Sequence, residues 1–282
     1  MDVATVDLWA TSGRSYLHRA SPAAKLIAAA LLLAGVILVL NVLVVATVFV
    51  LVLAVARRSG IPVGRFTLAA LYPGIFALLF ALAQFHGDFF IPATTIAKAV
   101  TAASVVVLLI ATTPYPRLFA ALRPVLPDTI VEVLYVTYRS VFILLRVLGD
   151  AFTSVRLRGG SAGAGLRARL RNAAAALAVG AVYSFDVSER TYAVMRLRGY
   201  SGRISGEQAG GLRPADLPLV TGAVLVAALV VLFRCEWRAL NPFSWMPLAA
   251  AITIFAVALV LPRRASPAGQ RPVTEIVRGD AE

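Results

Sequence analysis

The sequence predicts an all-α integral membrane protein with about six transmembrane helices and two long cytoplasmic helices. Of its 282 residues, 60% are apolar and the mean hydropathy is +0.83, whereas soluble domains are typically about 45–50% apolar. The apolar residues gather in uncharged runs close to the roughly 20 residues that cross a bilayer. The basic residues gather elsewhere, with 14 arginines in the segment 114–216.

Six spans follow from these runs. Residues 26–56 are uncharged and too long for one upright helix, so we expect two spans paired as a tight hairpin near Asn41. The other predicted spans are 66–85, 95–113, 217–233 and 245–261. The chain therefore divides into a four-span membrane part (1–113), a cytoplasmic segment (114–216), two C-terminal spans (217–261) and a cytoplasmic tail (262–282).

The distribution of basic residues predicts the orientation. With the N-terminus in the cytoplasm, all but three of the 27 Lys and Arg residues face that side, the exceptions being Lys98, Arg234 and Arg238. Cytoplasmic loops of membrane proteins carry such an excess. We therefore expect a multi-pass protein of the inner (cytoplasmic) membrane with both termini in the cytoplasm. The net charge of +13 then reflects topology, and no nucleic-acid partner is expected.

The sequence lacks the residues that several other functions require. No acidic residue lies within a predicted span, whereas ion pathways usually carry intramembrane ionisable groups. Neither lysine follows a glycine, so there is no phosphate-binding loop of the Gly-Lys-Ser/Thr type. His18 and His86 fall on opposite sides of the membrane and Cys235 is isolated, so no metal site or other cofactor is expected.

The cytoplasmic segment contains two long predicted helices. Asp128 follows Pro127 and can cap a helix over 129–158, which would be about 45 Å long. A second helix is expected over 166–198. Small residues at 173–181 would allow it to approach another helix closely.

Both helices end in the same four residues, Arg-Leu-Arg-Gly, at 156–159 and 196–199. A glycine after a helix end adopts a left-handed cap, and arginine in the last turn complements the helix dipole, so each end alone is compatible with a simple cap. The repetition favours a second interpretation. In this interpretation, exposed guanidinium groups dock into carboxylate-lined grooves of a partner.

At these helix ends the sequence resembles the transmembrane T component of energy-coupling-factor (ECF) transporters, an ABC-type family, in its cobalt-type CbiQ branch. The family's two Ala-Arg-Gly-like signatures, at the ends of crossing coupling helices, correspond to Leu-Arg-Gly at 157–159 and 197–199. Residues 21–25 resemble the family's Asp-Pro-Arg-x-Lys before the first span, without its Asp and Arg. Further similarity lies at 112–116, 138–142, 188–192, Met195 and 199–203. The sixth span and the tail are not covered.

The resemblance implies a non-catalytic subunit that works with two ATP-binding cassette ATPases and a membrane substrate-binding (S) component. The residues implied to couple to the ATPases are Arg158, Gly159, Arg198 and Gly199, with Arg156 and Arg196 assisting. Cobalt is the implied substrate, and nickel or a vitamin remains an alternative.

Two further functions are weighed against this one. An autonomous permease is disfavoured by the absence of intramembrane charges. A lipid-modifying membrane enzyme would need paired carboxylates or a Ser/His constellation. The acids available for it are Asp150, Asp186 and Glu189, and we expect Glu189 to pair with a nearby arginine instead.

Overall fold

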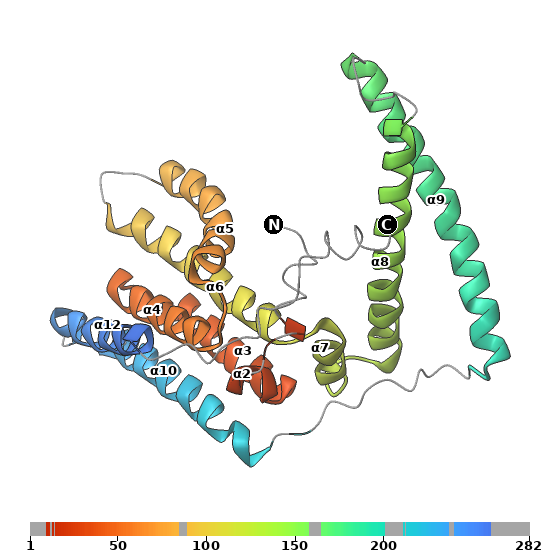
Figure 1. Ribbon diagram of the computed structural model, residues 1–282. Helices are drawn as coiled ribbons and strands as arrows, with labels where there is room; N and C mark the ends of the chain where they lie inside the picture. Colours follow the sequence, from red (N-terminus) through yellow and green to blue (C-terminus); the bar gives the residue numbers. More distant parts are fainter. Residues whose placement is uncertain are drawn as a thin grey trace. The chain divides into compact units, whose positions relative to one another are not determined.

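A computed structural model describes residues 10–11, 13, 15–84, 89–157, 165–200, 211, 213–236 and 240–260 (Figure 1). These residues form helices and short helical turns, without a strand. The chain divides into unit 1, Met1–Ala121 with Ala209–Glu282, and unit 2, Leu122–Gln208. The predicted all-α membrane fold is thereby confirmed.

Unit 1 contains a helix at the position of every predicted span. These helices are α3 (Pro22–Leu38), α4 (Val42–Arg58), α5 (Val63–Ala83), α6 (Phe90–Thr112), α10 (Leu217–Cys235) and α12 (Trp245–Val260), with the short helices α2 (Tyr16–Arg19), α7 (Tyr115–Leu122), η1 (Pro214–Asp216) and η2 (Asn241–Phe243) beside them. Among the described residues, four segments are long and apolar enough to cross a membrane: α5, α6, 214–235 and 241–260. Helices α3 and α4 have 17 residues each.

The six helices alternate in direction along the chain. The starts of α3 and α10 meet the end of α6 around Lys25, and the starts of α4 and α12 meet at Asn41. Helices α5 and α6 pack as an antiparallel pair, with Gly74 against Val100. We call the two ends of unit 1 the Lys25 end and the Asn41 end.

The predicted hairpin of the first two spans is wrong in its packing. Residues 39–41 join α3 to α4, but α3 packs mainly on α10 and α6, whereas α4 packs mainly on α12 and α6. One cause is Gly35, which brings α3 close to Val230 of α10, since a Cβ at Gly35 would lie 3.8 Å from that side chain. Polar anchors at Lys25 and Asn41 also bind each helix to a different neighbour.

The core of unit 1 is a cluster of β-branched and small residues from α3, α4, α6 and α10, joined by Phe66 at the start of α5. Valines 44, 45 and 48 and Phe66 are almost completely buried. Large apolar side chains also cover the exterior, including Leu68, Tyr72 and Phe76 on α5. An apolar exterior of this extent is typical of a surface in contact with lipid.

Unit 2 is a pair of long helices, α8 (Asp128–Leu157) and α9 (Leu166–Leu197). They run antiparallel (Figure 1), because Gly180 faces Leu148 and Tyr200, just after α9, bonds to Glu132 near the start of α8. Both helices begin and end within one residue of the predicted bounds. The small-residue stretch of α9 performs its predicted role, since Ala176 and Gly180 are buried.

Candidate functional site

The end of α9 has the geometry of a Schellman cap. Gly199 has a φ of +78°, and its N–H donates to the Arg196 carbonyl at 3.0 Å. The N–H of Tyr200 donates to the Met195 carbonyl at 3.0 Å. This pattern satisfies carbonyls that the helix end would leave unpaired. The chain therefore turns sharply at Gly199, and the Arg196 and Arg198 side chains are exposed at the turn.

The end of α8 is described only in part. Arg156 is exposed, and α8 ends at Leu157, whose side chain is 84% exposed. Arg158 and Gly159 lie outside the described residues, so the predicted repetition of the cap at this end stays a prediction. Leu197, the equivalent leucine of α9, is 88% exposed. A leucine so exposed contributes nothing to packing within unit 2.

The antiparallel packing of unit 2 places Arg156 and Leu157, at the end of α8, and Arg196, Leu197 and Arg198, at the end of α9, at opposite ends of the helix pair. Arg198 lies near the start of α8, because its neighbour Tyr200 bonds to Glu132, whereas Leu157 is the last residue of the same helix. At about 1.5 Å per residue, the two ends are about 40 Å apart. They therefore form two separate sites.

A side-chain hydrogen bond holds the α9 end in place. The Tyr200 hydroxyl donates to Glu132 Oε2 at 2.9 Å, and Glu132 is buried. The hydrogen bond to Glu132, with a smaller effect of burial, raises the pKa of Tyr200 above its ordinary value. Tyr200 lies in the family-like segment 199–203, but its contact with Glu132 was not predicted. It fixes the chain two residues beyond Arg198.

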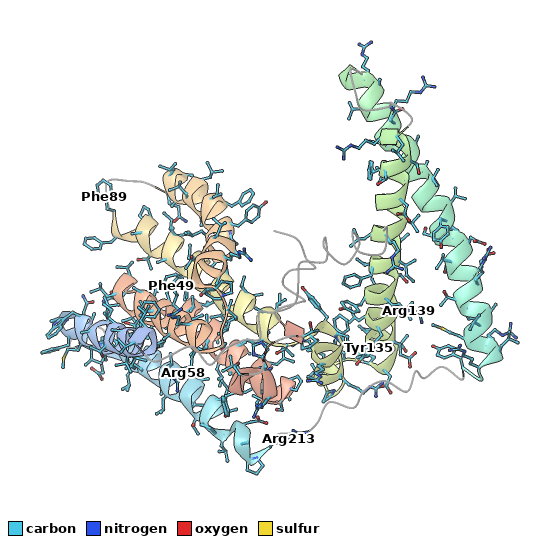
Figure 2. The ribbon with its side chains drawn as sticks, in the orientation of Figure 1. Phe49, Arg58, Phe89, Tyr135, Arg139 and Arg213 are labelled. Atoms are coloured by element: carbon cyan, nitrogen blue, oxygen red, sulfur yellow. The ribbon has the colours of Figure 1, made fainter. Side chains whose placement is uncertain are left out.

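The acids considered for lipid chemistry do not form a paired site. Asp150, Asp186 and Glu189 are all exposed. Asp186 forms an ion pair with Arg190 at 3.1 Å, so the acid that pairs with an arginine here is Asp186, whereas the prediction named Glu189. The α8–α9 groove is lined by apolar and hydroxyl side chains, among them Ser140, Ile143, Leu144, Ser184, Thr191 and Met195. Figure 2 shows Arg139 on α8, whose side chain is exposed.

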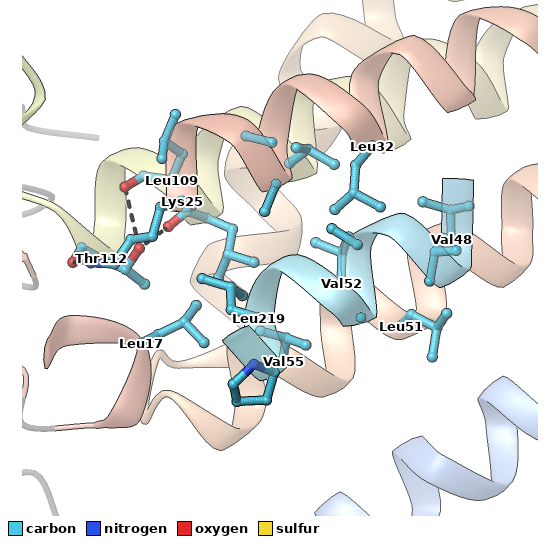
Figure 3. A pocket seen from close by; sticks show the side chains of 18 residues that line it. Leu17, Lys25, Leu32, Val48, Leu51, Val52, Val55, Leu109, Thr112 and Leu219 are labelled. Atoms are coloured by element: carbon cyan, nitrogen blue, oxygen red, sulfur yellow. Dashed lines mark hydrogen bonds between the residues drawn. The ribbon is translucent and has the colours of Figure 1, made fainter. Parts of the chain in front are cut away.

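A second polar site, at the Lys25 end of unit 1, was not predicted. The Lys25 ammonium is buried and donates to the Thr112 carbonyl at 3.0 Å (Figure 3). It also donates to Thr113 Oγ1 at 3.0 Å. The Asp216 carboxylate is buried and accepts from the Ser21 N–H at 3.0 Å. The sequence signals were the family-like segments 21–25 and 112–116, which did not predict that Lys25 contacts Thr112 and Thr113.

An apolar cavity of about 270 Å³ adjoins this polar site. It lies among α3, α4, α6 and α10, and Lys25 and Thr112 are at one end of it (Figure 3). The described residues contain no group of three His, Cys, Asp or Glu side chains that could hold a metal ion. His18, in α2, has its Nδ1 2.7 Å from Ser15 Oγ, and His86 lies outside the described residues.

The fold and these sites define a multi-pass, all-α membrane protein with a two-helix extension that carries an arginine at a capped helix end. The comparison with known families gives the same class, since residues 13–208 match the CbiQ family, described as cobalt transport protein. The chain belongs to this family and is a membrane component of a cobalt transporter. The matched region includes α8 and α9 and ends before α10. No curated protein matches the chain.

Proposed function

We propose that this chain is the transmembrane coupling subunit of an energy-coupling-factor ABC importer for cobalt. Two cytoplasmic ATPases bind unit 2, and a separate membrane component (the S component) captures the ion. The observation that carries the proposal is that the helix ends at Leu157 and Leu197, which belong to the two Arg-Leu-Arg-Gly repeats of the sequence, lie at opposite ends of one antiparallel helix pair.

The separation of these ends suits two partner subunits. Ends about 40 Å apart cannot enter one carboxylate-lined groove, and two ATPases can bind one end each. Because α8 and α9 pack on each other, a change in the distance between the ATPases acts on both helices together. When ATP binding draws the ATPases together, the helix pair shifts, and the membrane helices reorient the S component so that its site opens inward.

Arg158 and Arg198 are the contacts in this mechanism. A guanidinium group is always charged and can bind a carboxylate with two parallel hydrogen bonds. Gly199, which has a positive φ, turns the chain away from the groove. Gly159 has the same place in its own Arg-Leu-Arg-Gly repeat and is assigned the same role. Arg156 and Arg196 precede these arginines by two residues and so point about 200° away around the helix. They assist by contacting lipid phosphates.

The proposed orientation has the cytoplasmic segment (114–216) and both termini on the inner side of the cytoplasmic membrane. The alternating directions of the six helices support it, since α3 begins and α4 and α6 end at the Lys25 end. The exposed residues Arg58, the last residue of α4, and Arg213, before α10, are labelled in Figure 2 and belong to the same end. Such basic residues are typical of the cytoplasmic side.

The test is co-purification of the tagged chain with the products of its neighbouring genes. Wild type is expected to bring an ATPase pair and a small membrane protein. Loss of one partner from a buried, hydrogen-bonded charge pair costs about 2–5 kcal/mol, or about 30-fold or more in affinity. The double variant Arg158→Ala/Arg198→Ala should therefore lose the ATPases.

The matched control is Arg139→Ala/Arg146→Ala, which removes the same charge from exposed positions within α8. It should retain the ATPases. Equal losses in both double variants would indicate a general charge effect, and retention in Arg158→Ala/Arg198→Ala would contradict the assigned contacts. Ion uptake by vesicles that contain this chain alone would instead support the permease alternative. Competition between cobalt, nickel and vitamins in the complete complex identifies the substrate.

A further inference from the structure

Two chain connections join unit 1 to unit 2. Where each connection leaves unit 1, it is hydrogen-bonded to the first turn of α3 or to its N-cap. One connection follows α6 at Thr112 and continues through α7. The other enters α10 through Asp216. If the subunit transmits movement of unit 2 to the membrane helices, that movement reaches them through these two stretches of the chain.

The first connection is held by Lys25. Its ammonium group donates to the Thr112 carbonyl, at the last residue of α6, and to Thr113 Oγ1, both at 3.0 Å. The negative end of the α6 dipole stabilises a positive charge at this position. Lys25 is only 5% exposed, so the ammonium group depends on these partners. A buried charge is costly unless it is paired and hydrogen-bonded.

The second connection is held by Asp216. Its Oδ1 accepts from the Ser21 N–H, and its Oδ2 from the Arg213 N–H, each at 3.0 Å. The Tyr16 hydroxyl adds a hydrogen bond to the Ala215 carbonyl. Ser21 is the N-cap of α3, so the Asp216 carboxylate lies at the positive end of that helix dipole, which stabilises its negative charge. Asp216 is 2% exposed.

One helical turn therefore binds the end of α6 through Lys25 and the start of α10 through Ser21. We propose that this turn, residues 21–25, is a joint that carries movement of unit 2 into the membrane helices, with Lys25 and Asp216 as its positioning residues. The inference rests on the proposed coupling function. With the joint closed, displacement of either connection moves α3; with the joint broken, each connection moves separately.

The adjoining cavity gives this joint room to move. It is lined by Lys25 of the joint, by Leu219 of α10 and by residues of α4 such as Val52 (Figure 3). Close-packed interiors resist displacement because any shift creates overlap. The free volume between the joint and α4 lets the first turn of α3 shift without such overlap.

The experiment uses the complete complex, with its ATPases and S component, reconstituted in lipid vesicles. Four variants are compared with wild type: Lys25→Met, Asp216→Asn, and the conservative Lys25→Arg and Asp216→Glu. ATPase co-purification, ATP hydrolysis and cobalt uptake are measured for each. Lys25→Met and Asp216→Asn should keep the ATPases and hydrolysis, whereas uptake per ATP falls by about 2- to 30-fold, the range of coupling effects at such positions.

The outcomes separate the joint from the proposed function. If wild type binds no ATPase, the coupling function itself fails. If the ATPases bind and Lys25→Met and Asp216→Asn show wild-type uptake per ATP, the joint is refuted even where the yield of folded protein falls. Partial recovery in Lys25→Arg and Asp216→Glu supports it, because these variants keep the charge at each position.

A distance measurement keeps the inference testable if Lys25→Met does not fold. Spin labels are placed at the exposed residues Arg117 and Arg213, one beside each connection, in a Cys235→Ser background. A joint that stays closed predicts the same distance between the labels with and without ATP, in the otherwise native complex. A change in that distance between the two states would overturn the inference.

Discussion

Replacing Gly180 with leucine tests whether the close approach of α8 and α9 organises unit 2. A Cβ added at Gly180 would lie 2.9 Å from Leu148 Cδ2 and 3.6 Å from Leu148 Cγ. Favourable contacts between carbon atoms lie at about 3.5–4.0 Å, so even the first added atom overlaps its neighbour. In Gly180→Ala only the end of the flexible Leu148 side chain has to move.

The two substitutions should therefore differ in their effect on the stability of unit 2 and on the spacing of its helices. Gly180→Ala gains about 0.5–1 kcal/mol from the lower entropy of the unfolded chain, which offsets most of the overlap. Gly180→Leu adds three more carbon atoms at the same contact, and overpacking of this kind costs about 1–3 kcal/mol. Packed helices lie about 8–10 Å apart depending on the side chains between them, so the helix pair should widen by up to about 2 Å.

The assay combines thermal unfolding with spin-label distances across the helix pair, between exposed positions Thr137 and Glu189 in a Cys235→Ser background. Ala181→Leu is the matched control, since Ala181 is the next residue of α9 and is exposed. Gly180→Leu should lower the unfolding temperature and lengthen the distance, whereas Ala181→Leu should change neither. Unchanged distance and stability in Gly180→Leu would show that this contact does not determine the packing of unit 2.

Substitutions at three further positions have outcomes that follow from the surroundings of each residue. Gly199→Ala should cost about 1–2 kcal/mol, the strain of a left-handed conformation, and should speed hydrogen exchange at the end of α9, where its φ is +78°; unchanged exchange would contradict the cap. Asn41→Ala removes the α4 cap and hydrogen bonds of 2.6 Å to Asn241 and Ser244, and should lower unfolding stability in detergent by about 2–4 kcal/mol. Asn41→Ser should restore about 1 kcal/mol of that loss, because a serine retains the cap alone. Gly222→Ala should raise the free energy of unfolding by about 0.5–1 kcal/mol, since a Cβ added at this position meets no atom within 4 Å. A loss of stability would show that there is no room for the added methyl group.

The sequence predicted the helices well and their neighbours poorly. Uncharged runs located the membrane helices, and local composition located α8 and α9, because helix formation depends on local composition and on polar residues at the ends. The predicted cap at Asp128 was misplaced by one residue, since α8 begins at Asp128 itself. Packing partners were not predictable, because an uncharged valine-rich helix offers similar faces to several neighbours. Lys25 and Asn41, each a single polar residue beside an apolar run, decide which helices α3 and α4 contact.

The candidate site was likewise predictable where it depends on local sequence and unpredictable where it depends on packing. The cap at Gly199 could be predicted because it depends on one glycine after one helix. The hydrogen bond between Tyr200 and Glu132 could not, since the residues are 68 positions apart and meet only once α8 and α9 pack antiparallel. The same packing places Leu157 and Leu197 at opposite ends of the helix pair, a relationship that the repeated sequence alone does not contain.

The two helices beyond the family match are integral to unit 1. The match ends at residue 208, yet α10 packs on α3 along its length, from Asp216 at Ser21 to Val230 at Gly35. Helix α12 packs on α4 and is joined to it through Asn41. Because α3 and α4 make few contacts with each other, α6, α10 and α12 hold them in place. The C-terminal helices therefore complete the membrane core to which α8 and α9 are connected by the chain.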